Sequence, residues 1–288
     1  GTREVAFVLF ANAWHFPSGS SFNPDNSVKT EAPYLAGRTL MGSLGWTLQP
    51  SETVECTTRL TGRTYDVDPG SNFINVLSGM EPGYKYARSQ DLRLEGQVTW
   101  KTHRDLLLAM GLAANRYDAI PFSTDLVRPV DLSSGISGEI PGLPPGGNAA
   151  DFFHVTGQVL GGFLQAQYQP DLRWSLTLGG RYERDSRFGA TWTPRLGLVW
   201  TPTGDHSVKL LYGTAFLAPS PFRAFQHYGS FRATGPGTYA SSFWHLPNPG
   251  LQPERERTLE LSYRVVLRES LGVTAAFHRT DLSDLHTS

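Results

Sequence analysis

Eight histidines and one cysteine are the side chains of this sequence that most readily ligate a metal ion or act as nucleophiles. No two histidines have the HxxxH or HExxH spacing that places both imidazoles on one face of a helix, so no metal site is predicted. Cys56 is the single cysteine, which excludes an intrachain disulfide and a CxxC metal site. It falls in a predicted strand, where a lone cysteine is more often a small apolar side chain than a nucleophile. The histidines are His15, His103, His154, His206, His227, His245, His278 and His286.

The segment Gly142–Gly147 is rich in glycine, but it follows no predicted strand and precedes no predicted helix. A phosphate-binding loop needs both, so a flexible loop is the better interpretation. The 25 basic residues are balanced by 26 acidic ones, and no basic surface for nucleic acid is indicated. The sequence therefore predicts no cofactor, no nucleic-acid partner and no enzyme activity.

The richest candidate for ligand contact is the connection between residues 218 and 255, which combines many aromatic side chains with arginine and histidine. Aromatic rings and guanidinium groups suit a catecholate or another flat, anionic chelate through stacking and cation–π contact. The alternative is that these rings pack the connection onto itself or onto neighbouring loops. The candidate residues are Phe222, Arg223, Phe225, His227, Tyr228, Phe231, Arg232, Tyr239, Phe243, Trp244 and His245.

The elements that position these residues are predicted to be strands. The chain has 30 glycines, 20 prolines and only 3 methionines, a composition that favours strands and turns. Along Arg173–Glu183 polar and apolar residues alternate, with Trp174 and Tyr182 at the two ends of the apolar face. Trp192 and Trp200 bound a second apolar face of the same length. Eight residues of a tilted strand span roughly 20 Å, which is close to the apolar band of a membrane barrel.

Eleven strands are predicted, and the connections between them are alternately short and mostly long. A short turn such as residues 169–171 is typical of one side, and a long connection such as residues 218–255 of the other. A soluble β-sandwich also alternates polar and apolar residues, but it gives no reason for this order of connections. We therefore predict an all-β, transmembrane, antiparallel up-and-down β-barrel. The predicted strands are residues 4–16, 34–49, 52–68, 88–101, 104–118, 152–168, 172–187, 190–202, 206–217, 256–268 and 270–283.

The second half of the chain resembles the TonB-dependent outer-membrane receptors. Tyr212–Ser220 (YGTAFLAPS) is similar to the YGxAFRAPS motif of that family, and Asn248–Glu254 (NPGLQPE) is similar to its NPxLxPE motif. Gly180–Glu183 and Pro194–Leu198 also resemble strands of the family, so that the resemblance covers about residues 152 to 285. Leu217 departs from the motif, which usually has arginine there, and a ligand role is not expected at that position. The motif residues are Tyr212, Gly213, Ala215, Phe216, Pro219, Ser220, Asn248, Pro249, Leu251, Pro253 and Glu254.

The resemblance implies a barrel of about twenty-two strands with a plug in its lumen, in contact with the lipid of the outer membrane of a Gram-negative bacterium. Such receptors import a scarce ligand, most often an iron–siderophore, with energy that TonB passes to the plug. Cobalamin, haem or a glycan are alternative ligands in the same family. Two other classes remain as alternatives. A passive porin would lack the two motifs, and an outer-membrane phospholipase would need a Ser/His pair near the rim that the sequence does not identify.

Residues 1–288 are predicted to form about half of such a barrel. Residues 1 to 30 have the pattern of a strand followed by a loop, so we expect the plug domain and the TonB box to lie outside this chain. The last residues, Leu285 to Ser288, lack the terminal aromatic residue that usually ends such barrels. Eleven strands alone would leave two unpaired edges, which lipid does not tolerate. We therefore expect the chain to be a fragment of a longer receptor.

Overall fold

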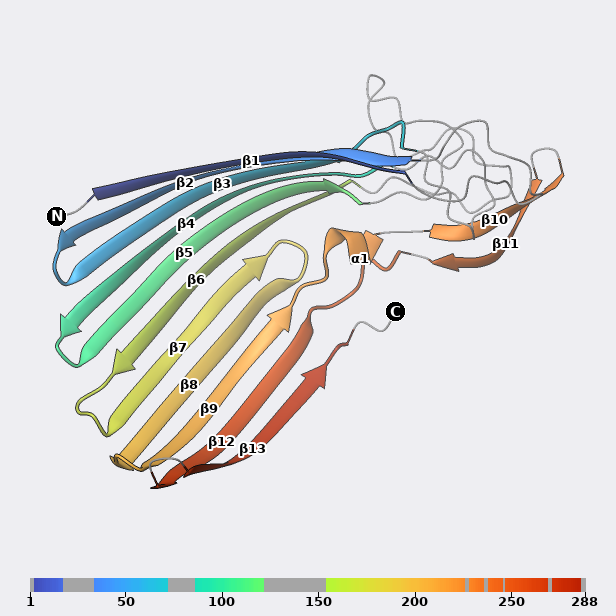
Figure 1. Ribbon diagram of the computed structural model, residues 1–288. Helices are drawn as coiled ribbons and strands as arrows, with labels where there is room; N and C mark the ends of the chain where they lie inside the picture. The colour runs from blue at the N-terminus through green and yellow to red at the C-terminus, as the bar shows by residue number, and fades with distance from the viewer. Residues whose placement is uncertain are drawn as a thin grey trace.

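A computed structural model describes residues 3–17, 34–71, 86–121, 154–225, 228–235, 238–245, 247–268 and 271–285, and only the backbone of 228–245. Its main feature is one antiparallel sheet of eleven strands (Figure 1). The described residues include no helix long and apolar enough to cross a membrane. The strands of the sheet are β1 (Arg3–Pro17), β2 (Tyr34–Ser51), β3 (Val54–Val67), β4 (Arg88–His103), β5 (Leu106–Ile120), β6 (Val155–Tyr168), β7 (Trp174–Asp185), β8 (Gly189–Thr203), β9 (His206–Leu217), β12 (Glu254–Arg268) and β13 (Leu271–Ser283).

The sheet is an up-and-down meander, as predicted. Its strand order is β1-β2-β3-β4-β5-β6-β7-β8-β9-β12-β13, so each strand pairs with the next strand of the meander and the sheet is not closed. Short turns join the strands at one end of the sheet, and the long connections lie at the other (Figure 1). The eleven predicted strands are all present, with ends that differ by up to three residues.

The long connection between β9 and β12, predicted as residues 218–255, contains a helix and two strands that were not predicted. It begins with a short helix, α1 (Pro221–Phe225), and continues into β10 (Tyr228–Gly235) and β11 (Thr238–His245). These two strands pair only with each other, as a separate two-stranded sheet. Their alternation was hidden because the segment is rich in glycine and serine, which sequence patterns assign to loops.

The two faces of the large sheet differ in polarity, because residues opposite each other in the ladder point to the same side. The convex face carries a band of exposed leucine, valine and aromatic side chains, including Leu94, Leu112 and Leu178. Trp174 and Trp200 pair across β7 and β8, and their rings stack with centroids 5.5 Å apart. The concave face instead carries many charged residues of β3, β4 and β7, Arg59, Arg93 and Arg181 among them.

A small buried core lies where the strands meet the long connections. Val67, Tyr86 and Ile120 are each 2 % exposed or less. Ser71 is fully buried, and its hydroxyl donates to the Ala36 carbonyl at 3.1 Å and accepts from the Ala36 amide at 3.0 Å. Burial raises the pKa of the Tyr86 phenol above its ordinary value. This core fixes the ends of β2, β3 and β4 relative to one another.

Aromatic rings fill the space above several glycines of the sheet. At Gly180 a Cβ atom would overlap the indole ring of Trp192, which comes from the neighbouring strand β8. The absence of a side chain on one strand therefore makes room for a large ring on the next, as in other twisted sheets. The same arrangement joins Gly37 with Trp14, Gly111 with Phe163 and Gly157 with Tyr117.

Candidate functional site

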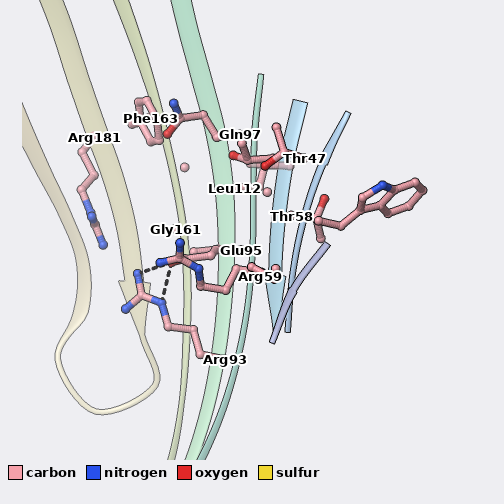
Figure 2. A pocket seen from close by; sticks show the side chains of 18 of the residues that line it. Thr47, Thr58, Arg59, Arg93, Glu95, Gln97, Leu112, Gly161, Phe163 and Arg181 are labelled. Atoms are coloured by element: carbon pink, nitrogen blue, oxygen red, sulfur yellow. Dashed lines mark hydrogen bonds and ion pairs between the residues drawn. The ribbon is translucent and has the colours of Figure 1, made fainter. Parts of the chain in front are cut away.

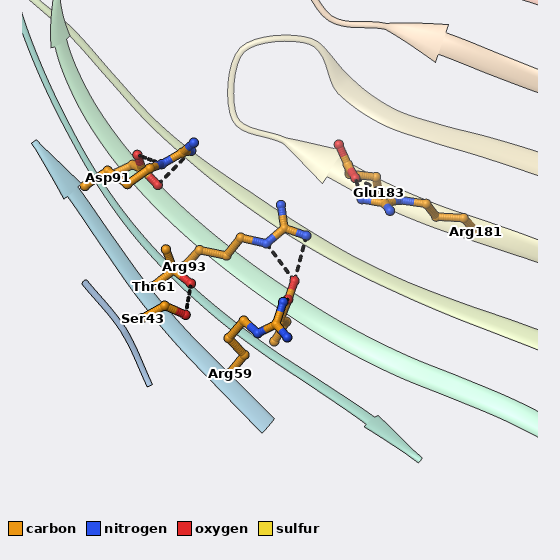
Figure 3. Close-up of polar contacts among 9 residues, drawn as sticks. Ser43, Arg59, Thr61, Asp91, Arg93, Arg181 and Glu183 are labelled. Atoms are coloured by element: carbon orange, nitrogen blue, oxygen red, sulfur yellow. Dashed lines mark hydrogen bonds and ion pairs between the residues drawn. The ribbon is translucent and has the colours of Figure 1, made fainter. Parts of the chain in front are cut away.

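The concave face of β3 and β4 carries a group of ion pairs that comes from the strict alternation of these strands (Figure 3). Arg63 on β3 donates two hydrogen bonds to the Asp91 carboxylate on β4, from Nε at 2.7 Å and from Nη2 at 3.2 Å. On the same face Arg93 donates to Glu95 at 2.9 Å. Arg59 lies opposite Glu95 in the ladder, with a nitrogen 3.9 Å from its second oxygen. Glu95 is therefore shared by two arginines, and this part of the wall keeps an excess positive charge.

A pocket of ≈ 470 Å³ lies against these residues on the concave face (Figure 2). Arg59, Arg93 and Arg181 line it together with Gln97 and Phe163. Several of its lining residues are glycines, Gly45, Gly111 and Gly161 among them, and the Phe163 ring lies over Gly111. Arg181 is itself paired with Glu183, two residues along β7. The pocket thus presents mainly hydrogen-bond donors, which suit carboxylate, phosphate or peptide carbonyl groups.

Sequence reasoning did not single out this group of residues. Alternation does place Arg93, Glu95 and Gln97 on one face of β4, but it does not show which residues of β3 lie opposite. Only the register brings Arg59 to Glu95 and Arg63 to Asp91. The sequence feature that could have pointed to this group is the number of charged residues on the polar face of each predicted strand.

The two sequence motifs of the second half lie side by side at the end of the sheet that carries the long connections. Strand β9 ends in the first motif and β12 begins at the end of the second, and the two strands are paired. In this ladder Phe216 is opposite Arg255, and Leu217 is opposite Glu254. The motifs therefore mark where the chain leaves the sheet into a long connection and where it returns.

Hydrogen bonds explain why particular residue types occupy these motifs. The Ser220 side-chain oxygen accepts the Arg223 amide at 3.2 Å, and its carbonyl accepts the Ala224 amide at 3.1 Å, so that Ser220 starts α1. Pro219 is buried and ends the ladder because it has no amide to donate. On the return, the Asn248 side chain accepts the Gly250 amide at 3.2 Å in a tight turn.

An ion pair joins the two motif segments across the long connection. The Arg223 guanidinium of α1 lies 3.8 Å from the Glu254 carboxylate at the start of β12. Leu217, the residue opposite Glu254 in the ladder, is 60 % exposed and is uncharged, so it cannot form an ion pair with Glu254. Among the described residues, the cation next to Glu254 therefore comes from α1 and not from β9.

The predicted ligand-contact residues fall on three elements of one connection. Phe222, Arg223 and Phe225 lie in α1, and the Phe222 side chain is half exposed. Tyr228, Phe231 and Arg232 lie in β10, whereas Tyr239, Phe243, Trp244 and His245 lie in β11. His227 lies outside the described residues, and so do the side chains of β10 and β11. Apart from His227, the structure places these residues in one hairpin and the helix before it, and their part in binding stays a prediction.

The sequence matches the family described as TonB dependent receptor-like, beta-barrel, over residues 3–288. The chain belongs to this family. The TonB-dependent receptors are transporters and receptors of the outer membrane of Gram-negative bacteria, and the lipid-facing side of the barrel wall is the convex face described above. The concave face with its arginines is correspondingly the luminal face.

One curated relative is the iron-regulated outer membrane virulence protein of Vibrio cholerae, which is 26 % identical over 172 residues. The match takes in 58 % of this chain and 25 % of the relative, so this TonB-dependent receptor chain spans about a quarter of that protein.

Solved structures of the family have the same fold. The ferric enterobactin receptor of Pseudomonas aeruginosa has a TM-score of 0.57 at 18 % identity, with 85 % of this chain and 35 % of the receptor covered. The FrpB iron transporter of Neisseria meningitidis has a TM-score of 0.59 at 12 % identity, with 97 % and 43 % covered.

Proposed function

We propose that this chain is part of the barrel wall of a receptor that imports an iron–siderophore with energy supplied through TonB. The observation that carries the proposal is the polarity of the wall. The convex face of the sheet is apolar. On its concave face, Arg59, Arg93 and Arg181 line a pocket that is rich in hydrogen-bond donors. Such a lumen suits the passage of an anionic chelate, or the packing of a plug whose carboxylates and carbonyls accept those donors.

The named relatives support iron as the cargo. The Vibrio relative is described as iron-regulated, and the similar solved structures are a ferric enterobactin receptor and an iron transporter. The aromatic and arginine residues of α1, β10 and β11 fit a flat anionic chelate by stacking and cation–π contact. TonB acts, in this proposal, on a plug domain that belongs to the parent receptor and lies outside residues 1–288.

The proposal is tested by uptake of radioactive iron into cells that carry the full-length receptor as their only siderophore receptor. We expect uptake of at least one ferric siderophore, and its loss in the same strain without TonB. Cobalamin and haem are offered in parallel, and uptake of either one alone would replace iron–siderophore as the cargo. Uptake that persists without TonB would overturn the proposal in favour of a passive barrel.

A pair of variants separates the luminal wall from the lipid-facing wall. The double substitution Arg59→Gln with Arg93→Gln neutralises the two cations that share Glu95. We expect it to lower the initial rate of uptake. Arg184→Gln removes one exposed cation from the convex face of β7 and is expected to leave the rate unchanged. Equal effects of the two changes would contradict a role for the luminal face.

A further inference from the structure

A groove crosses the lipid-facing side of β1 to β4. Gly42 and Gly62 are opposite each other in the ladder, with Leu9 beside Gly42 on β1 and Leu92 beside Gly62 on β4. A Cβ atom placed on Gly42 would meet nothing within 4 Å, so the surface is hollow there. The groove has a volume of ≈ 510 Å³, and Leu40 also lines it. Most of its accessible surface is apolar and faces the membrane, and Thr64, Gln90 and Asp118 also line it.

A cation with no ion-pair partner among the described residues stands at the end of this groove. Arg116 on β5 is opposite Leu92 in the ladder, lines the groove and is exposed. It forms no ion pair with any other residue that the structure describes. The acid on the same face of β5, Asp118, is already engaged, with Arg88 at 3.7 Å and His154 at 2.7 Å. The charge of Arg116 is therefore available to a ligand.

The height of Arg116 places it at the membrane interface. It lies ten residues beyond Leu106, the first residue of β5 after the short turn. At a rise of about 3.3 Å per residue and a tilt near 40°, ten residues correspond to roughly 25 Å along the barrel axis, the full height of the apolar band. The long connections of such barrels are extracellular. The guanidinium thus reaches the headgroup region of the outer leaflet. Gly42 and Gly62 occupy the same ladder row, nine residues before Ser51 and eight beyond Val54, so they lie only slightly lower, at the upper end of the apolar band.

Two other lipid-facing arginines lie at a matching height. Arg184 is ten residues beyond Trp174 on β7, and Arg257 is eleven residues before Arg268 on β12. Both are exposed, and neither forms an ion pair with another described residue. Arginine facing lipid is costly at the middle of the membrane and nearly neutral at the interface, which agrees with this placement. Arg116 differs from these two because it alone of the three borders the groove.

We propose that the convex face of β1 to β5 binds a phosphorylated, acylated glycolipid of the outer leaflet. An acyl chain occupies the hollow over Gly42 and Gly62, and a phosphate of the headgroup pairs with Arg116. The apolar groove accounts for a chain, and the Arg116 guanidinium, which pairs with no described residue, accounts for a phosphate through its planar donor fork. A soluble phosphate would use neither the groove nor its leucines. The site is separate from the lumen, so it does not depend on which ligand the receptor imports.

The test uses the full-length receptor, purified in mild detergent, stripped of lipid and titrated with bisphosphorylated lipid A under native mass spectrometry. We expect wild-type receptor to hold one lipid more tightly than any further copies. Arg116→Gln is expected to weaken that first binding about tenfold, the loss typical of one charge-assisted pair. Gly42→Leu fills the hollow and is expected to weaken it comparably. Arg116→Lys keeps the charge and should retain most of the affinity.

Matched controls distinguish a site from a general belt of charge. Arg184→Gln removes a cation of the same height with no groove beside it, and Ala114→Leu adds apolar bulk to the same face one ladder row away. Both are expected to leave the first binding unchanged. An equal loss in Arg116→Gln and Arg184→Gln would overturn the proposal, as would full competition by millimolar inorganic pyrophosphate. Unchanged binding in both Gly42→Leu and Arg116→Gln would also overturn it.

Discussion

The Arg187 guanidinium donates a hydrogen bond to the Pro219 carbonyl at 3.1 Å, across 32 residues of sequence. Arg187 belongs to the connection between β7 and β8, and Pro219 follows the end of β9 within the first family motif. The Arg187 side chain is only 16 % exposed, and its guanidinium carbon lies over the rings of Phe188 at 4.4 Å and Tyr117 at 5.2 Å. One side chain therefore fixes the position at which the chain leaves the sheet after β9.

Arg187→Ala should lower the free energy of unfolding of the full-length receptor by about 2 kcal/mol, because a partly buried cation loses a backbone acceptor and two rings at once. Denaturant unfolding in detergent measures the change. Hydrogen exchange should rise at the amides of Ser220 and Phe222, next to Pro219, more than elsewhere. Arg184→Ala is the matched control, since Arg184 is exposed and forms no ion pair with a described residue. Equal destabilisation by the two variants would mean that the hydrogen bond to Pro219 does not contribute to the free energy of unfolding.

The ion pair between Arg223 and Glu254 should contribute little to stability, below about 1 kcal/mol, because the Arg223 side chain is half exposed and its nitrogen lies 3.8 Å from the carboxylate. A double-mutant cycle with Arg223→Ala and Glu254→Gln measures the coupling directly. Leu217→Arg places a guanidinium opposite Glu254 in the ladder. In the Arg223→Ala background it should restore a coupling of the same sign. No coupling of residue 217 with Glu254 would show that an arginine there points elsewhere.

Gly180→Val should destabilise the barrel wall by about 1 to 3 kcal/mol, because even a Cβ atom at this position overlaps the ring of Trp192. The comparison is Gly213→Ala on β9, where an added Cβ would meet nothing within 4 Å. That change should be neutral. Combining Gly180→Ala with Trp192→Leu removes the overlapping ring, so the effect of Gly180→Ala should be smaller in this background than with Trp192 present. Unfolding in denaturant tests all the variants, and additive losses would contradict the contact.

The strands were predictable because lipid on one side and a polar lumen on the other impose alternation on every strand. The ends of the strands were less predictable, and Pro50 illustrates the reason. The second strand was predicted to end at residue 49, yet β2 continues to Ser51, which pairs with Val54. The ladder shifts register between Leu48 and Ser51, and this irregularity accommodates a proline that cannot donate. A similar shift accompanies Pro202, between Trp200 and Thr203.

The luminal ion pairs and the contact of Arg187 were not predictable from the sequence. Arg63 and Asp91 are 28 residues apart, and only the register of β3 with β4 brings them together. A shift of the register by one residue would turn one partner toward lipid, and alternation does not specify how two strands align. The motif residues were found by resemblance, but the structure supplies their physical roles. Ser220 starts α1, Asn248 closes a turn, and Pro219 offers its carbonyl to Arg187.

Replacing residues 228–245 with a short Gly-Ser linker should weaken binding of the ferric siderophore by at least about tenfold, because β10 and β11 carry most of the predicted contact residues. The barrel should still form, since the two strands pair only with each other and the β9–β12 ladder lies outside the replaced segment. Fluorescence titration of the purified full-length receptor measures the affinity, and denaturant unfolding checks the barrel. The same linker inserted between Arg104 and Asp105, in a short turn at the opposite end of the sheet, should leave affinity unchanged. If the replacement binds the chelate as tightly as wild type, the hairpin has no role in recognition, and the aromatic residues of this connection pack against the protein instead.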